Sequence, residues 1–283
     1  MRVLIITAFI VIFCQRTEAQ PFIDLLNIHG QWTKESINDD KDSSHTETQF
    51  FSLDLSIPIK IKKDVLLFTP FVAQWEIKDV RTYKARTYSL PIAFVKQWKN
   101  ENIKTSFVFI TRTNHDPDES MENSLQLGGI VLHTIKKHER LKFKFGLYYN
   151  TEFFGPYFRP LLGIDWKVTE RINVFGVLPA NMNLEYFLTK SIHTGIAFRT
   201  YTNSYRQASD SLLRIDENYL KGFIDFYISK KHVFTLEAGH SILRKFRTGY
   251  REAGKTEYTD LKANDGYLIK IGYAYRLRLD DKY

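Results

Sequence analysis

The chain has 283 residues but only one cysteine, Cys14, and no apolar run long enough to cross a bilayer as a helix. A spanning helix needs about 20 consecutive apolar residues, whereas the apolar segment 3–14 is shorter and stands alone. A single thiol cannot form an internal disulfide, which argues against a small disulfide-stapled secreted domain. The missing apolar runs argue against a helical membrane protein.

Residues 1–19 have the features of a cleaved export signal. Arg2 supplies a positive start, residues 3–14 form a short apolar core, and Ala19 is the small residue that a signal peptidase prefers. We therefore expect a signal peptide over 1–19 and a single domain over 20–283, without cysteine. The alternative is a lipoprotein anchored through Cys14, but Phe13 precedes this cysteine where a small residue is usual.

Motifs of known catalytic chemistry are also missing. The chain has no G-x-S-x-G elbow, no phosphate-binding loop and no H-E-x-x-H zinc motif. His240 and Ser241 are adjacent, but neighbouring residues of a strand point to opposite faces and cannot form a dyad. We therefore expect no catalytic residues, no metal site, no cofactor and no enzymatic activity.

The net charge of +8 raises the question of a nucleic-acid partner. The sequence contains no helical element that could read DNA and no compact basic motif, and the export signal directs the chain away from nucleic acid. We expect no nucleic-acid partner.

The chain is rich in aromatic residues, with 22 Phe and 16 Tyr, and many lie in alternating patterns. In residues 267–279, an apolar set alternates with a small or cationic set. The apolar set is Ile269, Ile271, Tyr273, Tyr275, Leu277 and Leu279, and the other is Leu268, Lys270, Gly272, Ala274, Arg276 and Arg278. A period of two sends these sets to opposite faces of a strand. Such a strand suits a barrel wall, with lipid outside and a polar lumen inside.

Brief polar turns alternate with longer polar connections along the chain. The brief turns include 62–64, 99–102 and 229–231, and the longer connections include 78–86, 113–123, 150–158, 202–216 and 244–265. Outer-membrane barrels have short turns at one rim and long loops at the other. We predict an all-β fold, a transmembrane antiparallel up-and-down β-barrel of about fourteen strands. Twelve strands would result if 23–32 or 184–188 is not a full strand. A soluble secreted β-sandwich is the alternative fold.

The end of the chain resembles bacterial outer-membrane β-barrels, whose last strand carries alternate apolar residues and a terminal Phe or Tyr. Segments 160–166, 173–179 and 183–186 are similar to an uncharacterised family of outer-membrane barrels common in Bacteroidota. The resemblance implies the cell outer membrane as the location. It also implies outer-membrane lipid and the barrel-assembly machinery as partners, and an insertion signal at Tyr273, Tyr275 and Tyr283.

Alternation predicts which charged side chains face the lumen. We expect these to be Lys142, Lys144, Asp165, Lys167, Arg199, Lys221, Asp225, Glu237, Lys270, Arg276 and Arg278. In particular, we expect Asp225, Glu237 and Lys270 to form one linked set, with both carboxylates at similar heights in the membrane.

Two functions fit such a lumen. An open porin-like channel or solute transporter would favour small anionic solutes, because cations are in excess. A plugged, ion-paired interior would instead indicate a structural or adhesive barrel whose long loops bind a partner. A lipid-acting enzyme of the outer membrane is a more distant alternative.

Overall fold

The computed structural model describes residues 21–35, 46–79, 81–118, 120–208, 211–252, 255–261 and 263–279. The predicted signal peptide lies outside these ranges and stays a prediction. Within them, no helix is long and apolar enough to cross a membrane. The strands are β1 (Phe22–Glu35), β2 (Glu47–Leu55), β3 (Ile57–Ile61), β4 (Asp64–Phe68), β5 (Phe71–Lys78), β6 (Thr82–Gln97), β7 (Ile103–His115), β8 (Leu125–His138), β9 (Leu141–Glu152), β10 (Gly155–Lys167), β11 (Ile172–Leu178), β12 (Asn181–Phe187), β13 (Ile192–Arg206), β14 (Ser211–Tyr227), β15 (His232–Ser241), β16 (Lys245–Glu252), β17 (Lys255–Asp260) and β18 (Gly266–Arg278).

The strands form a closed barrel wall in which successive neighbours are antiparallel. The wall closes where β1 pairs with β18, from Phe22 opposite Arg278 to Glu35 opposite Gly266. β2 and β3 form one wall strand interrupted at Ser56, and β4 and β5 form another. Counting each of these pairs once, and leaving the β16–β17 hairpin aside, the described residues form fourteen wall strands. The predicted fold and strand number are confirmed.

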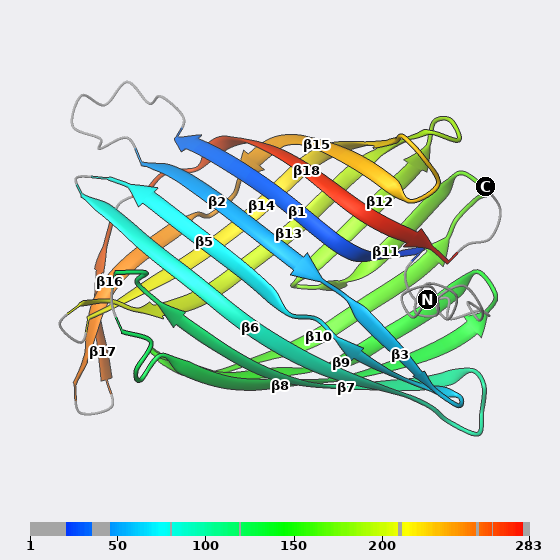
Figure 1. Cartoon of the computed structure of the whole chain (residues 1–283), viewed down its shortest axis with the longest axis horizontal. Coiled ribbons are helices and arrows are strands. Elements are labelled where there is room, and N and C mark those ends of the chain that lie inside the picture. Colours follow the sequence, from blue (N-terminus) through cyan, green and yellow to red (C-terminus); the bar gives the residue numbers. More distant parts are fainter. Residues whose placement is uncertain are drawn as a thin grey trace, which may run out of the picture.

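The two rims of the barrel differ, as Figure 1 shows. β1 begins and β18 ends at the rim that carries the brief turns, including those at 62–63, 139–140 and 228–231. In outer-membrane barrels this rim lies in the periplasm. The opposite, extracellular rim carries the β16–β17 hairpin, because β16 pairs with the first residues of β14 beyond the end of β15.

Side chains alternate between the outer surface and the interior along the wall strands. On β9, Phe143, Phe145 and Leu147 are 47–48% exposed, whereas Lys142 and Lys144 between them are buried. A wall that is apolar outside and charged inside is what a strand between lipid and lumen requires. The periodicity of two in the sequence therefore determines the two faces of the sheet.

Several segments that the sequence predicted as long loops are mostly strand. Residues 150–158 and 202–216 contribute to hairpins with brief turns, and 244–265 contains β16 and β17. The prediction was wrong there because strand pairing continues through segments whose many polar residues indicated loops. The run 184–188, whose strand status was open, lies largely in β12, where seven residues pair with β11 and β13.

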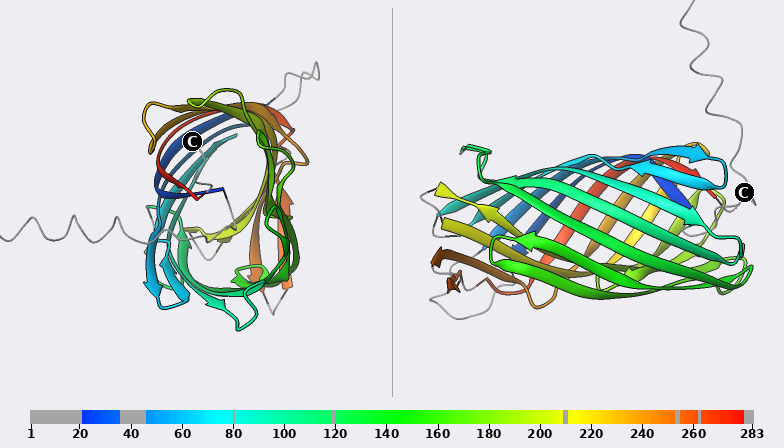
Figure 2. Two further views of the ribbon diagram at one scale, coloured as in Figure 1. Left: turned by 90° about the vertical axis from the view of Figure 1, so that its right-hand side faces the viewer. Right: turned by 90° about the horizontal axis from the view of Figure 1, so that it is seen from below.

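The tip of the β13–β14 hairpin turns into the lumen at the extracellular end. In the wall, β13 lies between β12 and β14, yet its last residue, Arg206, pairs with His115 of β7 on the far side of the barrel. The end-on view of Figure 2 shows this yellow hairpin inside the ring of strands. We call residues 201–208 and 211–216 of this hairpin the inner tip.

The inner tip forms the main apolar core of the molecule. Tyr205, Leu213 and Ile215 of the tip are fully or almost fully buried against β2, β5, β6, β16 and β18. Their partners include Trp75 and Phe246, which are also buried. Burying a side chain of this size contributes about 1.5–3 kcal/mol. Apolar packing therefore fills this part of the extracellular half of the lumen.

Candidate functional site

The predicted lumen residues face the interior of the barrel or its periplasmic rim. Those that are buried are Lys142, Lys144, Lys221, Asp225, Glu237 and Arg276, and those that are half-buried are Asp165, Lys167, Arg199, Lys270 and Arg278. Lys144 forms an ion pair of 2.7 Å with Asp165 on the neighbouring strand. Lys167 lies at the rim, where it pairs with Glu170 at 2.7 Å. The set therefore forms several separate groups.

One group is centred on Glu237 of β15. Its carboxylate lies 2.6 Å from Nζ of Lys221 and 3.1 Å from Nζ of Lys270, on the two neighbouring strands. Arg199, Glu237 and Lys270 line one small cavity of the lumen. Nη1 of Arg199 is buried there without a hydrogen-bond partner among the described residues. We call Arg199, Lys221, Glu237 and Lys270 the Glu237 cluster. The cluster holds three cations and one carboxylate, of which Lys221 and Lys270 contact Glu237, so it carries excess positive charge.

Asp225 lies outside the Glu237 cluster, which corrects the predicted link between Asp225, Glu237 and Lys270. Asp225 accepts a hydrogen bond of 2.6 Å from Arg276 and one of 2.6 Å from Thr235. The register places Thr235, not Glu237, opposite Asp225, so the two carboxylates differ in height by two residues. Arg276 is long enough to reach past β15 to Asp225, which counting from the turn did not anticipate.

A second group joins opposite walls near the periplasmic end. Arg278 of β18 donates hydrogen bonds of 3.0 and 3.2 Å to Glu185 of β12, across the lumen. It also donates one of 2.9 Å to Tyr227. Its neighbour Arg276 bonds to Asp24 at 2.6 Å and lies over the ring of Phe22. The sequence search missed Asp24 and Glu185, although their positions in alternating strands carried the signal.

Between these groups the lumen contains a small polar cavity of about 100 Å³. Its charged lining residues are Asp24, Arg199, Asp225, Glu237, Lys270 and Arg276. Such a volume holds a few water molecules or a small ion. Within the described part of the chain, no group of three or more His, Cys, Asp or Glu residues could hold a metal ion.

A polar network fastens the inner tip to the wall formed by β7, β8 and β9. Glu152 forms an ion pair with Arg112, and it accepts hydrogen bonds of 2.9 and 2.6 Å from the backbone N–H and hydroxyl of Ser204. Asn114 and Gln126 donate to the backbone carbonyl of Ser204 at 3.0 and 3.3 Å. These side chains supply the partners that the backbone of the tip would otherwise lack.

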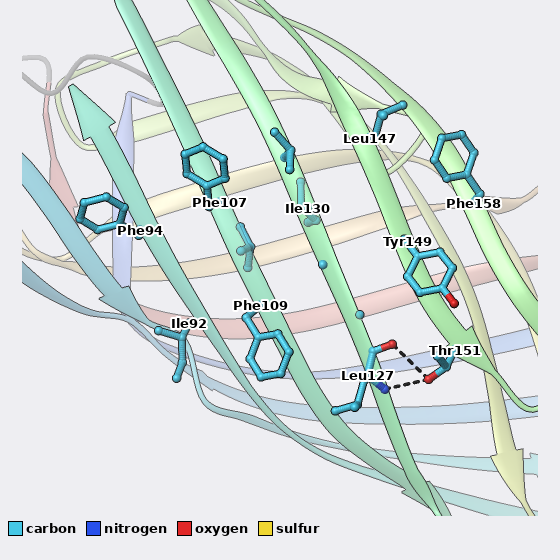
Figure 3. Close-up of a pocket in the computed structure, with 14 residues that line it drawn as sticks. Ile92, Phe94, Phe107, Phe109, Leu127, Ile130, Leu147, Tyr149, Thr151 and Phe158 are labelled. Atoms are coloured by element: carbon cyan, nitrogen blue, oxygen red, sulfur yellow. Dashed lines mark hydrogen bonds between the residues drawn. The ribbon is translucent and has the colours of Figure 1, made fainter. Parts of the chain in front are cut away.

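The outer surface is apolar and contains one broad hollow. The hollow measures about 820 Å³ and lies over β6 to β10, where Gly129 has no side chain to fill the space between its neighbours. Figure 3 shows Phe107, Phe109, Tyr149 and Phe158 around it. Because these side chains point outward, the hollow faces lipid.

The predicted insertion signal lies partly within the described residues. Tyr273 and Tyr275 are on the outer face of β18, close to the periplasmic rim, where His232 contacts both rings. Tyr283 lies outside the described residues. His240 packs against the ring of Tyr267, whereas the hydroxyl of Ser241 is buried and bonds to the backbone of Gly266. The two residues of this pair therefore point in opposite directions.

Fold and surface together define an outer-membrane β-barrel, and this chain is similar in fold to solved outer-membrane proteins. The COG4313 outer membrane channel from Pseudomonas putida has 8% sequence identity and a TM-score of 0.50, over 93% of this chain and 99% of that one. The NanC porin also has 8% identity, with a TM-score of 0.43 over 89% and 100% of the two chains. The translocator domain of the autotransporter NalP from Neisseria meningitidis has 10% identity and a TM-score of 0.35, over 89% and 88%.

Residues 101–275 match the domain of unknown function DUF6268, and the chain belongs to this family. Curated proteins provide no match to the sequence. The protein is thus located in the outer membrane, with lipid around its wall.

Proposed function

We propose that the protein is a narrow outer-membrane channel that favours small anions. The Glu237 cluster carries this proposal, because its three cations, Arg199, Lys221 and Lys270, outnumber its one carboxylate, whereas the other two carboxylates that line the cavity share Arg276. Charged side chains that line a pore select ions of the opposite sign. The ion pairs that cross the lumen leave room for small solutes only.

The inner tip gives this channel a closed state. Its apolar side chains and its network with Glu152 fill the extracellular half of the lumen, so conduction requires the tip to move. One backbone pair joins β13 of the tip to β7, whereas β14 of the tip pairs with β16 over residues 211–216, so an opening moves the tip together with the β16–β17 hairpin. We therefore expect brief openings rather than a steady current.

A reversal potential tests the anion preference. With the protein in a planar bilayer between unequal KCl solutions, the reversal potential should have the same sign as the Nernst potential of chloride. A reversal potential with the sign of the Nernst potential of potassium would contradict the proposal. We also expect the barrel-assembly machinery to recognise β18 and Tyr283, and we expect no enzymatic activity.

A structural or adhesive barrel is the second candidate. The observation that favours it is the burial of the inner tip, in which Tyr205 and Leu213 are inaccessible to solvent. In that case the extracellular hairpins would bind a partner and the lumen would never conduct. Absence of any current over a wide voltage range, from protein shown to be folded, would support this candidate instead.

A further inference from the structure

The barrel wall is not continuously paired between β10 and β13. Two short strands, β11 and β12, separate them, and these end at Leu178 and begin at Asn181. Pairing of β10 with β11 stops at Leu162. Pairing of β12 with β13 stops at Arg199, followed by one bond from the N–H of Thr200 to the carbonyl of Ala180. Extracellular to this point, no strand lies between β10 and β13 in the described wall.

The sequence of β10 keeps its edge unpaired. The N–H of Lys167 points to the β9 side, since it donates to Arg140, and the N–H of Val168 points to the β11 side, since it donates to Ile172. These directions alternate along a strand, and the register with β9 has no shift. Pro156 and Pro160 therefore sit where their missing N–H groups would face the gap. Proline at such positions prevents another strand from pairing.

The edge of β13 is unavailable for a different reason. Beyond Thr202 this strand has turned into the lumen, where Glu152 and Asn114 satisfy the backbone of Ser204. The two edges are therefore held apart, one by prolines and the other by the polar network of the inner tip.

A few isolated contacts bridge the gap, and at its extracellular end the N–H of Phe153 donates a hydrogen bond of 2.8 Å to the hydroxyl of Ser204. Nη2 of Arg159, an inward residue of β10, donates a hydrogen bond of 3.3 Å to the hydroxyl of Thr202 on β13. The guanidinium also lies 4.9 Å from the ring centre of Tyr157. At the extracellular end of the gap, the guanidinium of Arg214 lies over the ring of Phe154. A single hydrogen bond of 3.3 Å from a guanidinium to a hydroxyl is a weak closure compared with a strand ladder.

Lipid-facing apolar surface leads up to this gap. Phe158 and Leu162 of β10 are 58% and 67% exposed on the outer face, and Phe158 also lines the 820 Å³ hollow. On the inner side lie the cations Arg159 and Arg199. The gap thus has apolar surface outside and positive charge inside.

We propose that the gap between β10 and β13 is a lateral portal between the lumen and the outer leaflet, used by amphipathic anions with a single apolar chain. The chain would lie against Phe158 while the anionic head meets Arg159. Unpaired backbone groups are costly in hydrocarbon, and a polar head at the gap supplies partners for them. This portal deepens the proposed channel function by naming a class of solute, but its existence can be tested without any current.

The test uses a fluorescent bimane label on single cysteines of the full barrel in lipid nanodiscs. Tyr157→Cys reports from the inner side of the portal, and Asn27→Cys reports from the lumen behind the continuously paired β1. Phe158→Cys on the outer face shows full exposure to lipid. The quencher is stearate carrying a nitroxide on its chain, compared with phosphatidylcholine carrying the same nitroxide.

Stearate should quench the Tyr157→Cys label several-fold more strongly than the Asn27→Cys label, and more strongly than the phosphatidylcholine quencher does. Adding Arg159→Gln to Tyr157→Cys should reduce quenching by stearate. Equal quenching at the two inner positions would show a closed wall and overturn the portal. Equal quenching by the two lipids, or no effect of Arg159→Gln, would overturn the anionic class. Leu161→Cys, also inward on β10, replaces Tyr157→Cys if that variant does not fold. A barrel without conductance could still show the portal, so the two proposals fail separately.

Discussion

At the scale of single residues, the lumen is stabilised by charges that pair across strands. Glu237 is buried with two lysines, and its pairing with both offsets the cost of removing a carboxylate from water. In the proposed channel, Arg199 and the same lysines act on a passing anion. Stability and selectivity would then depend on the same side chains.

Lys270→Ala tests this dependence. Glu237 keeps Lys221 but loses the 3.1 Å bond to Lys270, so the free energy of unfolding should fall by about 1–3 kcal/mol. The reversal potential should shift toward cations. Lys245→Ala, which removes an exposed pair with Asp260, is the matched control and should change neither quantity appreciably. Urea unfolding in lipid vesicles and planar-bilayer recordings give the two readouts. An unchanged reversal potential would show that the Glu237 cluster does not determine ion selectivity.

At the scale of strands, β18 shows how depth in the membrane changes the cost of a charge. Ile271 lies at the middle of β18 on the outer face, whereas Tyr275 pairs with His232 near the periplasmic rim. Ile271→Arg should destabilise the barrel by about 2–4 kcal/mol, and Tyr275→Asp by about 1 kcal/mol or less, because charge is tolerated near the interface. Folding titrations into vesicles measure both. Equal costs would contradict the register of β18.

The inner tip of β13 and β14 gives a prediction in which a substitution increases conduction. Glu152→Gln leaves Arg112 without its charge partner and weakens the bonds to Ser204, and breaking a buried pair costs about 3–5 kcal/mol. The tip should detach more often, so the open time in bilayer recordings should rise. Glu170→Gln, at the exposed rim, should leave it unchanged. A fall in conductance would show that the network supports an open state instead.

The sequence predicted the strands and the inner face well because both follow from a period of two. Lys270 and Glu237 alternate with apolar residues, and they lie in the interior as expected. The partner of Asp225 was not predictable in this way, since Arg276 reaches it from a strand that is not a neighbour. The inner tip was missed because residues 201–206 keep the strand pattern, while the adjacent Ser204 and Tyr205, on opposite faces of the strand, are both buried. That requires knowledge of the opposite wall.

At the scale of the whole molecule, the barrel combines a closed wall at the periplasmic end with an extracellular half that is filled from within. In the proposed channel, the ion pairs across the lumen and the apolar packing of the tip act in series, so solute flow is limited by the higher of the two barriers. In the proposed channel the inner tip is the movable element, since it lies inside the wall and is paired with its surroundings only at β16 and at one position of β7.

A reversible tether of the inner tip tests this account most directly. His115 and Arg206 are partners in the β7–β13 pairing, so His115→Cys with Arg206→Cys places two thiols within reach of a disulfide. The measurement is single-channel conductance of this double variant before and after reduction. We predict that openings are absent in the oxidised form and return on reduction. Openings of equal size and frequency in both forms would contradict the account, because solutes would then pass the tip without moving it.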